Sequence, residues 1–269
     1  LPPRNDGVPA WDTLGEDQWA MAPELVSLYG TSMWDDLSEA QQKRLSLFEL
    51  GNFFSLTLQG ERPLVQGLAH RLYSKKNTVP VTEYLHHFLD EENKHMVMFG
   101  EFCNRYIGKV YPEKKLPLPR DYVKGEEEVV FFIKAMVVEE LGDYYNVKMQ
   151  HDERIHPLVQ KLNWVHHRDE ARHLAFGKAH LADLFKEYAP TWPAETLPSV
   201  RSWLGDYLRA SWRDFYNPSM YKDAGLEDAF EIRKQALEHP ACREHRRRAT
   251  AKLIQYFQSI GLLEEEPLL

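Results

Sequence analysis

Three acid–base side chains recur at helical spacing in the stretch NWVHHRDEARHLAFG, residues 163–177. Glu170 stands four residues after His166 and three before His173, so an α-helix would place all three on one face. That face also carries Leu158 and Leu162, which is typical of a helix face turned toward a core. An unpaired carboxylate buried there would cost several kcal/mol. A bound metal ion is the simplest partner, so the spacing predicts metal ligands.

A second pair at this spacing is Glu92 and His95, in DEENKHMVMFG. A Glu-x-x-His spacing puts a carboxylate and an imidazole one turn apart, where they can share an ion. The same spacing occurs twice more, at Glu83/His86 and Glu153/His156. The first falls in the opening turn of a predicted helix, where glutamate is ordinary. The second falls in a connector and is expected to be solvated.

Two further helices should each add one inward carboxylate. In AMVVEELGDYYN, Glu139 lies on the apolar face and Glu140 lies about 100° round the helix. In an earlier segment, Glu61 lies in the middle of a long helix and Glu49 lies nearer its start. We take Glu139 and Glu61 as the ligands, with Glu140 and Glu49 as the open alternatives.

Long helices must position these residues. The chain has 269 residues, 43% of them hydrophobic and only 14 of them glycine, and its apolar residues recur at the helical period. Ser38 and Gln41 form a capping-box pattern, which predicts a helix start. A Pro-rich connector spans about 111–125. We expect helices over about 16–29, 38–73, 82–108, 126–150, 157–188, 198–215, 226–238 and 241–261.

This order of helices predicts an all-α fold, a ferritin-like four-helix bundle in one domain over 1–269. Two short connections and one long connection, between the second and third helices, are typical of that bundle. The metal-binding core would span 38–188, between an N-terminal arm over 1–37 and additional helices over 189–269. The additional helices would cover the bundle or form a homodimer contact through aromatic residues, among them Trp203, Trp212 and Tyr216.

Composition argues against several other classes. A net charge of −8 disfavours a nucleic-acid surface, which needs a basic face. No apolar run reaches the roughly 18 residues of a membrane span, and no signal peptide is evident. Cys103 and Cys242 lie far apart and outside any Cys-x-x-Cys pair, which is typical of a reduced, cytoplasmic protein.

The predicted ligand set has seven members: Glu61, Glu92, His95, Glu139, His166, Glu170 and His173. Four carboxylates and two histidines on four facing helices are the recipe of ferritin-like di-iron and di-manganese sites, and His166 adds a third imidazole. Carboxylates suit iron and manganese, and imidazole suits iron. Two iron ions are therefore expected, with manganese as the alternative. His167 would replace His166 if the helix were rotated.

These motifs resemble those of a known family. DEARH (169–173) is similar to the signature of di-iron carboxylate oxygenases, and EENKH (91–95) is similar to its partner motif. With the third histidine, the set resembles the para-aminobenzoate N-oxygenase family over about residues 45–185. The resemblance implies that Asp169 and Glu91 orient histidine ligands, as ligating imidazoles generally require. It implies that Arg172 is a structural ion-pair partner.

The resemblance also implies an activity. Two iron ions would activate O2 and transfer oxygen to an aromatic amine nitrogen, with electrons from an external donor. Alternatives are a di-iron hydroxylase acting on carbon, an iron-handling ferroxidase and a metal-free interaction module. Leu56, five residues before Glu61, is apolar, and no cationic clamp for a benzoate is evident. An apolar or larger small-molecule substrate is therefore at least as well supported as a carboxylated arylamine.

A substrate pocket should lie beside the metals. Apolar residues on the ligand faces could line it or could simply fill the core: Phe88, Phe99, Phe132 and Met136.

Overall fold

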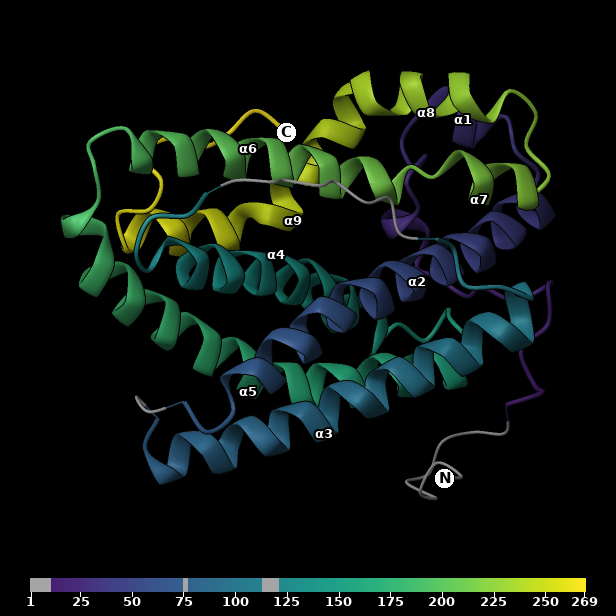
Figure 1. Cartoon of the computed structure of the whole chain (residues 1–269). Coiled ribbons are helices and arrows are strands. Elements are labelled where there is room, and N and C mark those ends of the chain that lie inside the picture. The colour runs from purple at the N-terminus through teal and green to yellow at the C-terminus, as the bar shows by residue number, and fades with distance from the viewer. Residues whose placement is uncertain (1–10, 75–76, 113–120) are drawn as a thin grey trace.

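A computed structural model describes residues 11–74, 77–112 and 121–269. Four long helices dominate it and lie along one another in Figure 1, with α2 against α3 and α4 against α5. Their bounds are Glu39–Arg71 for α2, Val79–Phe102 for α3, Glu126–Met149 for α4 and Pro157–Tyr188 for α5. No strand occurs within these described ranges, and the all-α bundle is confirmed.

The bundle helices begin where local chemistry favours a start. The predicted capping box of α2 is confirmed: Ser38 Oγ accepts from Gln41 N, and the Gln41 side chain accepts from Ser38 N. The first helical residue of α5 is Pro157, and Nδ1 of His156 accepts the Leu158 N–H at 3.1 Å. His156 is therefore a buried cap, and the prediction that it is solvated was wrong.

The long connector between α3 and α4 ends at a glycine. Gly125 has a φ of 79°, and a Cβ there would lie 2.1 Å from the Tyr188 ring. Three glutamates, 126–128, follow in the first turn of α4, where they suit the positive end of the helix dipole. Of the predicted connector, residues 113–120 lie outside the described ranges. The predicted helix over 82–108 is α3 followed by a π-helical turn, Cys103–Ile107, that stops at Gly108.

Shorter helices cover one side of the bundle (Figure 1). They are α6 (Thr196–Phe215), α7 (Pro218–Asp223), α8 (Ala229–Glu238) and α9 (Pro240–Ser259). The sequence did not predict α7, which is short and starts at an Asn-Pro pair. Trp203, Trp212 and Tyr216 are buried within the chain, and α9 packs on α4. These aromatic residues therefore cover the bundle.

The N-terminal arm differs from its prediction. The expected helix over 16–29 is wrong: Figure 1 and the backbone show turns, a short 3-10 helix at Pro23–Leu25 and a single helical turn, α1, at Ser32–Asp35. Pro23 removes a backbone donor and forces the residue before it, Ala22, into an extended conformation. The arm instead lies beside the start of α5, where Trp19 O accepts from His156 N at 3.0 Å. Residues 1–10 of the predicted arm lie outside the described part of the chain.

No helix in the described ranges is both long enough and apolar enough to cross a membrane.

Candidate metal centre

The four bundle helices bring the predicted ligand residues together in two adjacent groups. One group is Glu61 of α2, His95 of α3 and His166 of α5; the other is Glu92 of α3, Glu139 of α4, and Glu170 and His173 of α5. Within each group, one donor atom from every residue lies within 4.8 Å of the others. Such convergence requires the helices to face one another, which the spacing within each helix cannot specify.

One carboxylate stands between the two groups. Oε1 of Glu170 lies 3.1 Å from His166 Nε2 and 3.3 Å from His95 Nδ1, both in the first group. Its other oxygen, Oε2, lies 3.1 Å from His173 Nδ1 in the second group. Glu170 therefore presents one oxygen to the histidines of each group.

Glu92 is placed in the same way. Its Oε1 lies 2.8 Å from His173 Nδ1 and its Oε2 lies 3.7 Å from His95 Nδ1. At the outer side of the first group, Oε1 of Glu61 lies 3.4 Å from His166 Nε2. Two central carboxylates with imidazoles on both sides form the arrangement that two neighbouring ions need.

The donor atoms are buried, and eight of them lack a hydrogen-bond partner among the described residues. All seven side chains are at most 2% exposed. No hydrogen bond within the described residues satisfies eight of the donor atoms, which are both oxygens of Glu61, both of Glu92, Oε1 of Glu139, Oε1 of Glu170, Nδ1 of His95 and Nε2 of His166. Burying so many unsatisfied polar atoms without a ligand is strongly unfavourable. Their chemistry, carboxylate oxygen with imidazole nitrogen, fits iron or manganese.

The pKa shifts in the cluster indicate that bound metal ions would replace protons. Burial raises the pKa of Glu61 to about 7 and that of Glu139 well above its ordinary value, helped in both cases by neighbouring carboxylates. Burial opposes charge on His173, but Glu170 and other acids prevail and raise its pKa to about 11. The acids around His95 likewise raise its pKa against the effect of burial. Without metal, the cluster therefore retains protons, and cations would displace them.

A second layer of acids holds two of the histidines. Oδ2 of Asp169 lies 3.4 Å from His95 Nε2, and Oε2 of Glu91 lies 3.0 Å from His173 Nε2. Arg172 joins these acids, with its Nη2 2.5 Å from Glu91 Oε1 and 2.8 Å from Asp169 Oδ1. Against the effect of burial, these contacts lower the pKa of both carboxyls. The acids can then accept the Nε2–H of each imidazole and leave Nδ1 for a metal.

The third histidine has a partner that sequence reasoning missed. The side-chain nitrogen of Asn146, on α4, lies 2.5 Å from Nδ1 of His166, and Oδ1 of Asn146 has no partner. Because an amide can be rotated by half a turn without changing its shape, Oδ1 can take that position and accept the Nδ1–H. Nε2 of His166 then keeps its lone pair for a metal. The sequence does contain a sign of this role, because Asn146 lies two helical turns after Glu139 and so on the same face of the helix.

The alternative ligand residues lie elsewhere. Glu49 accepts the Ser27 N–H at 2.8 Å, and Glu140 pairs with Lys178. His167 Nδ1 lies 2.5 Å from Asp143 Oδ1, and its side chain is 32% exposed. The remaining Glu-x-x-His pair, Glu83/His86, belongs to neither group, and His86 contacts the exposed Tyr73 hydroxyl.

Two of the four expected pocket residues, Phe88 and Phe99, pack on proposed histidine ligands. The Phe88 ring stacks on His173 at 3.8 Å between centroids, and Phe99 meets His166 edge-on at 4.9 Å. Phe132 lies edge-on to His180, and Met136 fills the space above Gly177. None of the four lines the cavity described next.

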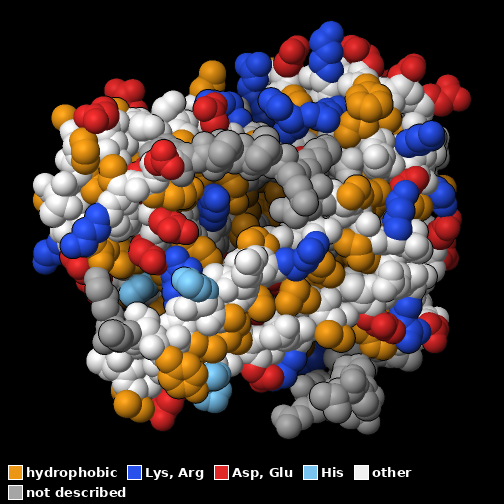
Figure 2. Space-filling view, viewed as in Figure 1, with side chains coloured by type: hydrophobic (Ala, Val, Ile, Leu, Met, Phe, Trp, Pro, Cys, Tyr) orange, Lys and Arg blue, Asp and Glu red, His pale blue; other side chains and the backbone are white. Residues whose placement is uncertain are grey.

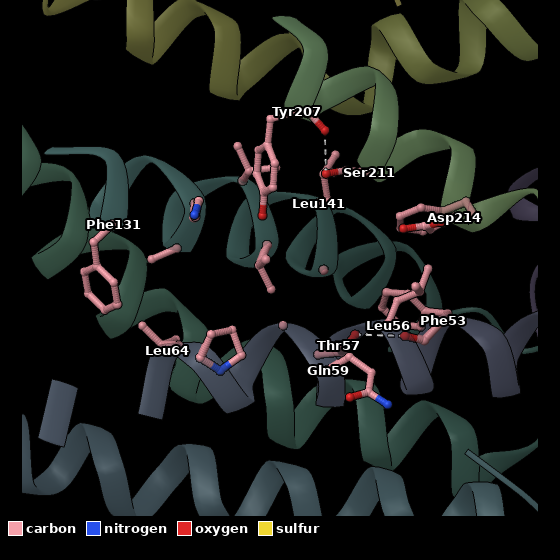
Figure 3. A pocket seen from close by; sticks show the side chains of 18 residues that line it. Phe53, Leu56, Thr57, Gln59, Leu64, Phe131, Leu141, Tyr207, Ser211 and Asp214 are labelled. Atoms are coloured by element: carbon pink, nitrogen blue, oxygen red, sulfur yellow. Dashed lines mark hydrogen bonds between the residues drawn. The ribbon is translucent and has the colours of Figure 1, made fainter. Parts of the chain in front are cut away.

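A cavity of about 290 Å³ lies between α2, α4 and α6. Figure 2 shows a hollow with hydrophobic walls on this side of the molecule. In Figure 3, Tyr207 and Ser211 of α6 face Thr57 and Leu64 of α2 across the cavity. Its remaining lining is mainly apolar and includes Leu56. This volume is close to the lower end of the range for small-molecule sites.

Comparison with known proteins agrees with the site. The model of the family described as P-aminobenzoate N-oxygenase AurF matches residues 9–261. The chain is 24% identical over 242 residues to an uncharacterized protein of Mycobacterium bovis, Mb0909, and to two of Mycobacterium tuberculosis, MT0908 and Rv0885. Each match covers 85% of this chain and 62% of the relative, so the chain spans about three fifths of their length. Since the family model matches nearly all of it, the chain belongs to the P-aminobenzoate N-oxygenase AurF family.

Proposed function

We propose that this protein is a di-iron oxygenase that uses O2 to oxidise a small organic substrate, with the nitrogen of an arylamine as the oxidised atom. The observation that carries the proposal is the pair of buried donor groups, whose unsatisfied oxygens and nitrogens would be satisfied by cations. Membership in the family supports iron as the metal and oxygenation as the reaction.

The bound irons would supply reduction of O2 and delivery of one oxygen atom to the substrate. For an amine RNH2, the balance is RNH2 + O2 + 2e⁻ + 2H⁺ → RNHOH + H2O, with electrons from an external donor. The chain's own residues would hold the metals: Glu61, His95 and His166 in one group, and Glu92, Glu139, Glu170 and His173 in the other. Asp169, Glu91 and Asn146 would fix which imidazole nitrogen faces the metals.

A cavity supports an oxygenase more than a ferroxidase. An iron-handling protein needs a path for ions, whereas an oxygenase needs an apolar space for an organic molecule. The cavity between α2, α4 and α6 has such walls, and two of its lining residues, Gly60 and Val138, precede Glu61 and Glu139 in the sequence.

A single turnover tests this function. Metal-free protein is loaded anaerobically with two equivalents of Fe(II), mixed with ¹⁸O2 and an arylamine panel, and followed by visible absorption and product mass. The expected result is two bound irons per chain and an amine product that contains ¹⁸O. Iron oxidation with release of ferric ion and unchanged amines would contradict the oxygenase function.

Two adjacent glutamates of α4 provide a matched control. Glu139→Ala removes a donor from the second group, whereas Glu140→Ala removes a neighbour that pairs with Lys178 outside the cluster. We expect the first variant to lose bound iron and turnover and the second to keep both. Equal iron content in the two variants would argue against the assigned ligands.

A further inference from the structure

The outward face of α5 carries a line of positively charged side chains. Lys161, Trp164, Arg168 and Arg172 follow one another at spacings of three, four and four residues, so the helix places them along one face. The side chains of Arg168 and Arg172 are 49% and 47% exposed, and Trp164 is 36% exposed. These four residues form a basic stripe.

No exposed acid of α5 offsets the charge of the stripe. Before Asp183, the only acidic residues of this helix are Asp169 and Glu170, and both are buried. On the neighbouring helix α4, Glu140 and Asp143 are mostly buried and are already paired with α5 side chains. The whole chain has a net charge of −8, so this face has the opposite sign to the molecule that carries it.

Trp164 lies between two of the cations. Lys161 Nζ is 3.8 Å from the centroid of its ring, and Arg168 Cζ is 5.2 Å from it. By contrast, Trp203 and Trp212 are buried under the covering helices. Core packing therefore does not account for Trp164. An exposed tryptophan beside arginine is typical of surfaces that bind another protein.

The basic stripe is connected to the first donor group. Arg168 Nε donates to Oδ1 of Asp169 at 3.1 Å, and Oδ2 of the same carboxylate lies 3.4 Å from Nε2 of His95. Arg168 is half exposed, whereas His95 is buried. A single carboxylate therefore stands between the surface and a proposed metal ligand.

A parallel connection leads from Arg172 to the second donor group. Its Nη2 lies 2.5 Å from Oε1 of Glu91, and Oε2 of Glu91 lies 3.0 Å from Nε2 of His173. The same face thus reaches one histidine of each donor group through one carboxylate. Because the rate of electron transfer falls steeply with distance, an electron donor seated on this face would serve both metal sites.

We propose that the basic stripe is the docking surface for an acidic one-electron carrier protein, with an iron–sulfur or flavin group, and that electrons enter through Asp169 and Glu91. The proposed reaction consumes two electrons for each O2. Two reduced carriers supply them one at a time, so two Fe(III) become two Fe(II) while both carriers are oxidised. Opposite charge on the carrier steers and orients its approach. This inference rests on the proposed function and adds the class of partner and the surface that receives it.

The first test measures docking without turnover. The probe is a plant-type [2Fe–2S] ferredoxin, a small acidic one-electron carrier, in its oxidised form. It is titrated calorimetrically into the iron-loaded, oxidised protein at low and at high salt. We expect saturable binding at low salt that weakens strongly as the salt concentration rises, because the attraction is between exposed charges.

Three substitutions locate the surface. Lys161→Glu reverses a charge of the stripe and Trp164→Ala removes its ring, and neither residue belongs to a donor group. Both should weaken ferredoxin binding, Lys161→Glu by about 5- to 30-fold. The matched control is Lys186→Glu, which makes the same change of charge at an exposed position of the same helix face. It lies about 20 Å beyond Arg172 and should leave binding unchanged.

Reduction of the bound iron gives a second readout. Reduced ferredoxin is mixed rapidly with the ferric protein, and its oxidation is followed by visible absorption. Lys161→Glu should slow this reduction at low salt by a factor similar to its effect on binding. Reduction by dithionite should stay unchanged in the same variant, because a small reductant needs no docking surface.

Unchanged ferredoxin binding in both Lys161→Glu and Trp164→Ala, or an equal loss in Lys186→Glu, would overturn the inference. Absence of ferredoxin binding to the unmodified protein would overturn it too. Binding of phosphatidylserine vesicles in its place, lost in Lys161→Glu, would assign the stripe to a membrane surface. Iron content is measured for every variant, so in these cases the proposed metal centre would stand. An unmodified protein that binds no iron would instead refute the proposed function.

Discussion

The side-chain amide of Asn146 on α4 lies 2.5 Å from Nδ1 of His166 on α5, a member of the first donor group. With Oδ1 of the amide turned toward Nδ1, this contact would leave Nε2 of His166 for a metal. It also explains why a polar amide is tolerated at a position with no exposure to solvent.

Replacing Asn146 tests this role. Asn146→Leu should lower metal affinity at the first group by about 10- to 100-fold, because His166 loses the acceptor that fixes its tautomer. Asn146→Asp keeps an acceptor and should retain most of the affinity. Isothermal titration with Fe(II) or Mn(II) measures both variants. Equal affinity in Asn146→Leu and the unmodified protein would show that Asn146 does not position the ligand.

Arg172 should matter less than the acids that it joins. Its side chain is 47% exposed, so the ion pairs with Glu91 and Asp169 are partly screened by water. Arg172→Leu should weaken metal binding only severalfold, whereas Asp169→Leu should weaken it by about 10- to 100-fold, because it removes the partner of His95. Metal titrations of both variants check this order, and the reverse order would contradict it.

Metal-free protein should lose stability as pH rises. The pKa of His173 is raised from 6.5 to about 11, so its stabilising effect is complete below pH 6.5 and is lost toward pH 11. The pKa of Glu61 is raised from 4.5 to about 7. Between pH 4.5 and pH 7 the folded protein keeps a proton that the unfolded chain releases, so the free energy of unfolding falls as pH rises. Both groups therefore lower the stability of the metal-free protein as pH rises. The Tm of the metal-free protein should therefore fall between about pH 5 and pH 9.

Bound metal should reverse much of this dependence, because the ions take the place of the protons. The metal-loaded protein should show a smaller fall in Tm over the same range, and loading should release protons. Calorimetry in buffers of different ionisation enthalpy measures that release. A metal-free Tm that rises over this range would contradict the assigned protonation of the cluster.

Glu49 should produce a separate pH effect outside the metal centre. It is buried, accepts from Ser27 N at 2.8 Å and has a pKa raised by burial from 4.5 to about 8. Its penalty to the fold grows from pH 4.5 to pH 8, where it reaches the order of a few kcal/mol. Glu49→Gln cannot ionise, so its stability relative to the unmodified protein should rise through that range. Urea unfolding measures the stability of both proteins across this pH range. A constant difference in stability between them would contradict a neutral Glu49.

Much of the bundle follows from local rules in the sequence. A capping box starts α2, and Pro157 starts α5. The spacing of Glu170 with His166 and His173 is a property of one helix, so it can be recognised before the fold is known. The choice of Glu139 over Glu140 needed only the direction of the apolar face, and Glu139 does lie with the other donors.

Other features depend on contacts between distant segments. On one side the cavity is lined by Tyr207 and Ser211 of α6, whose packing on α2 and α4 no periodicity specifies. The sequence therefore predicted a pocket at other residues, of which Phe88 and Phe99 pack on His173 and His166 instead. In the arm, helical periodicity over 16–29 was outweighed by Pro23 and by pairing with the start of α5.

The hydrogen bonds around Ser27 also bear on how the chain unfolds. Its hydroxyl contacts both Glu49 of α2 and, at 2.6 Å, the Tyr221 hydroxyl of α7, which is 194 residues further along the chain. All three side chains are buried, so one buried hydrogen-bond cluster connects the arm, the bundle and the covering helices. We expect these three segments to open together, with amide protons of α2 and α7 exchanging in one cooperative step. The covering helices then share the stability of the bundle that holds the metal donors.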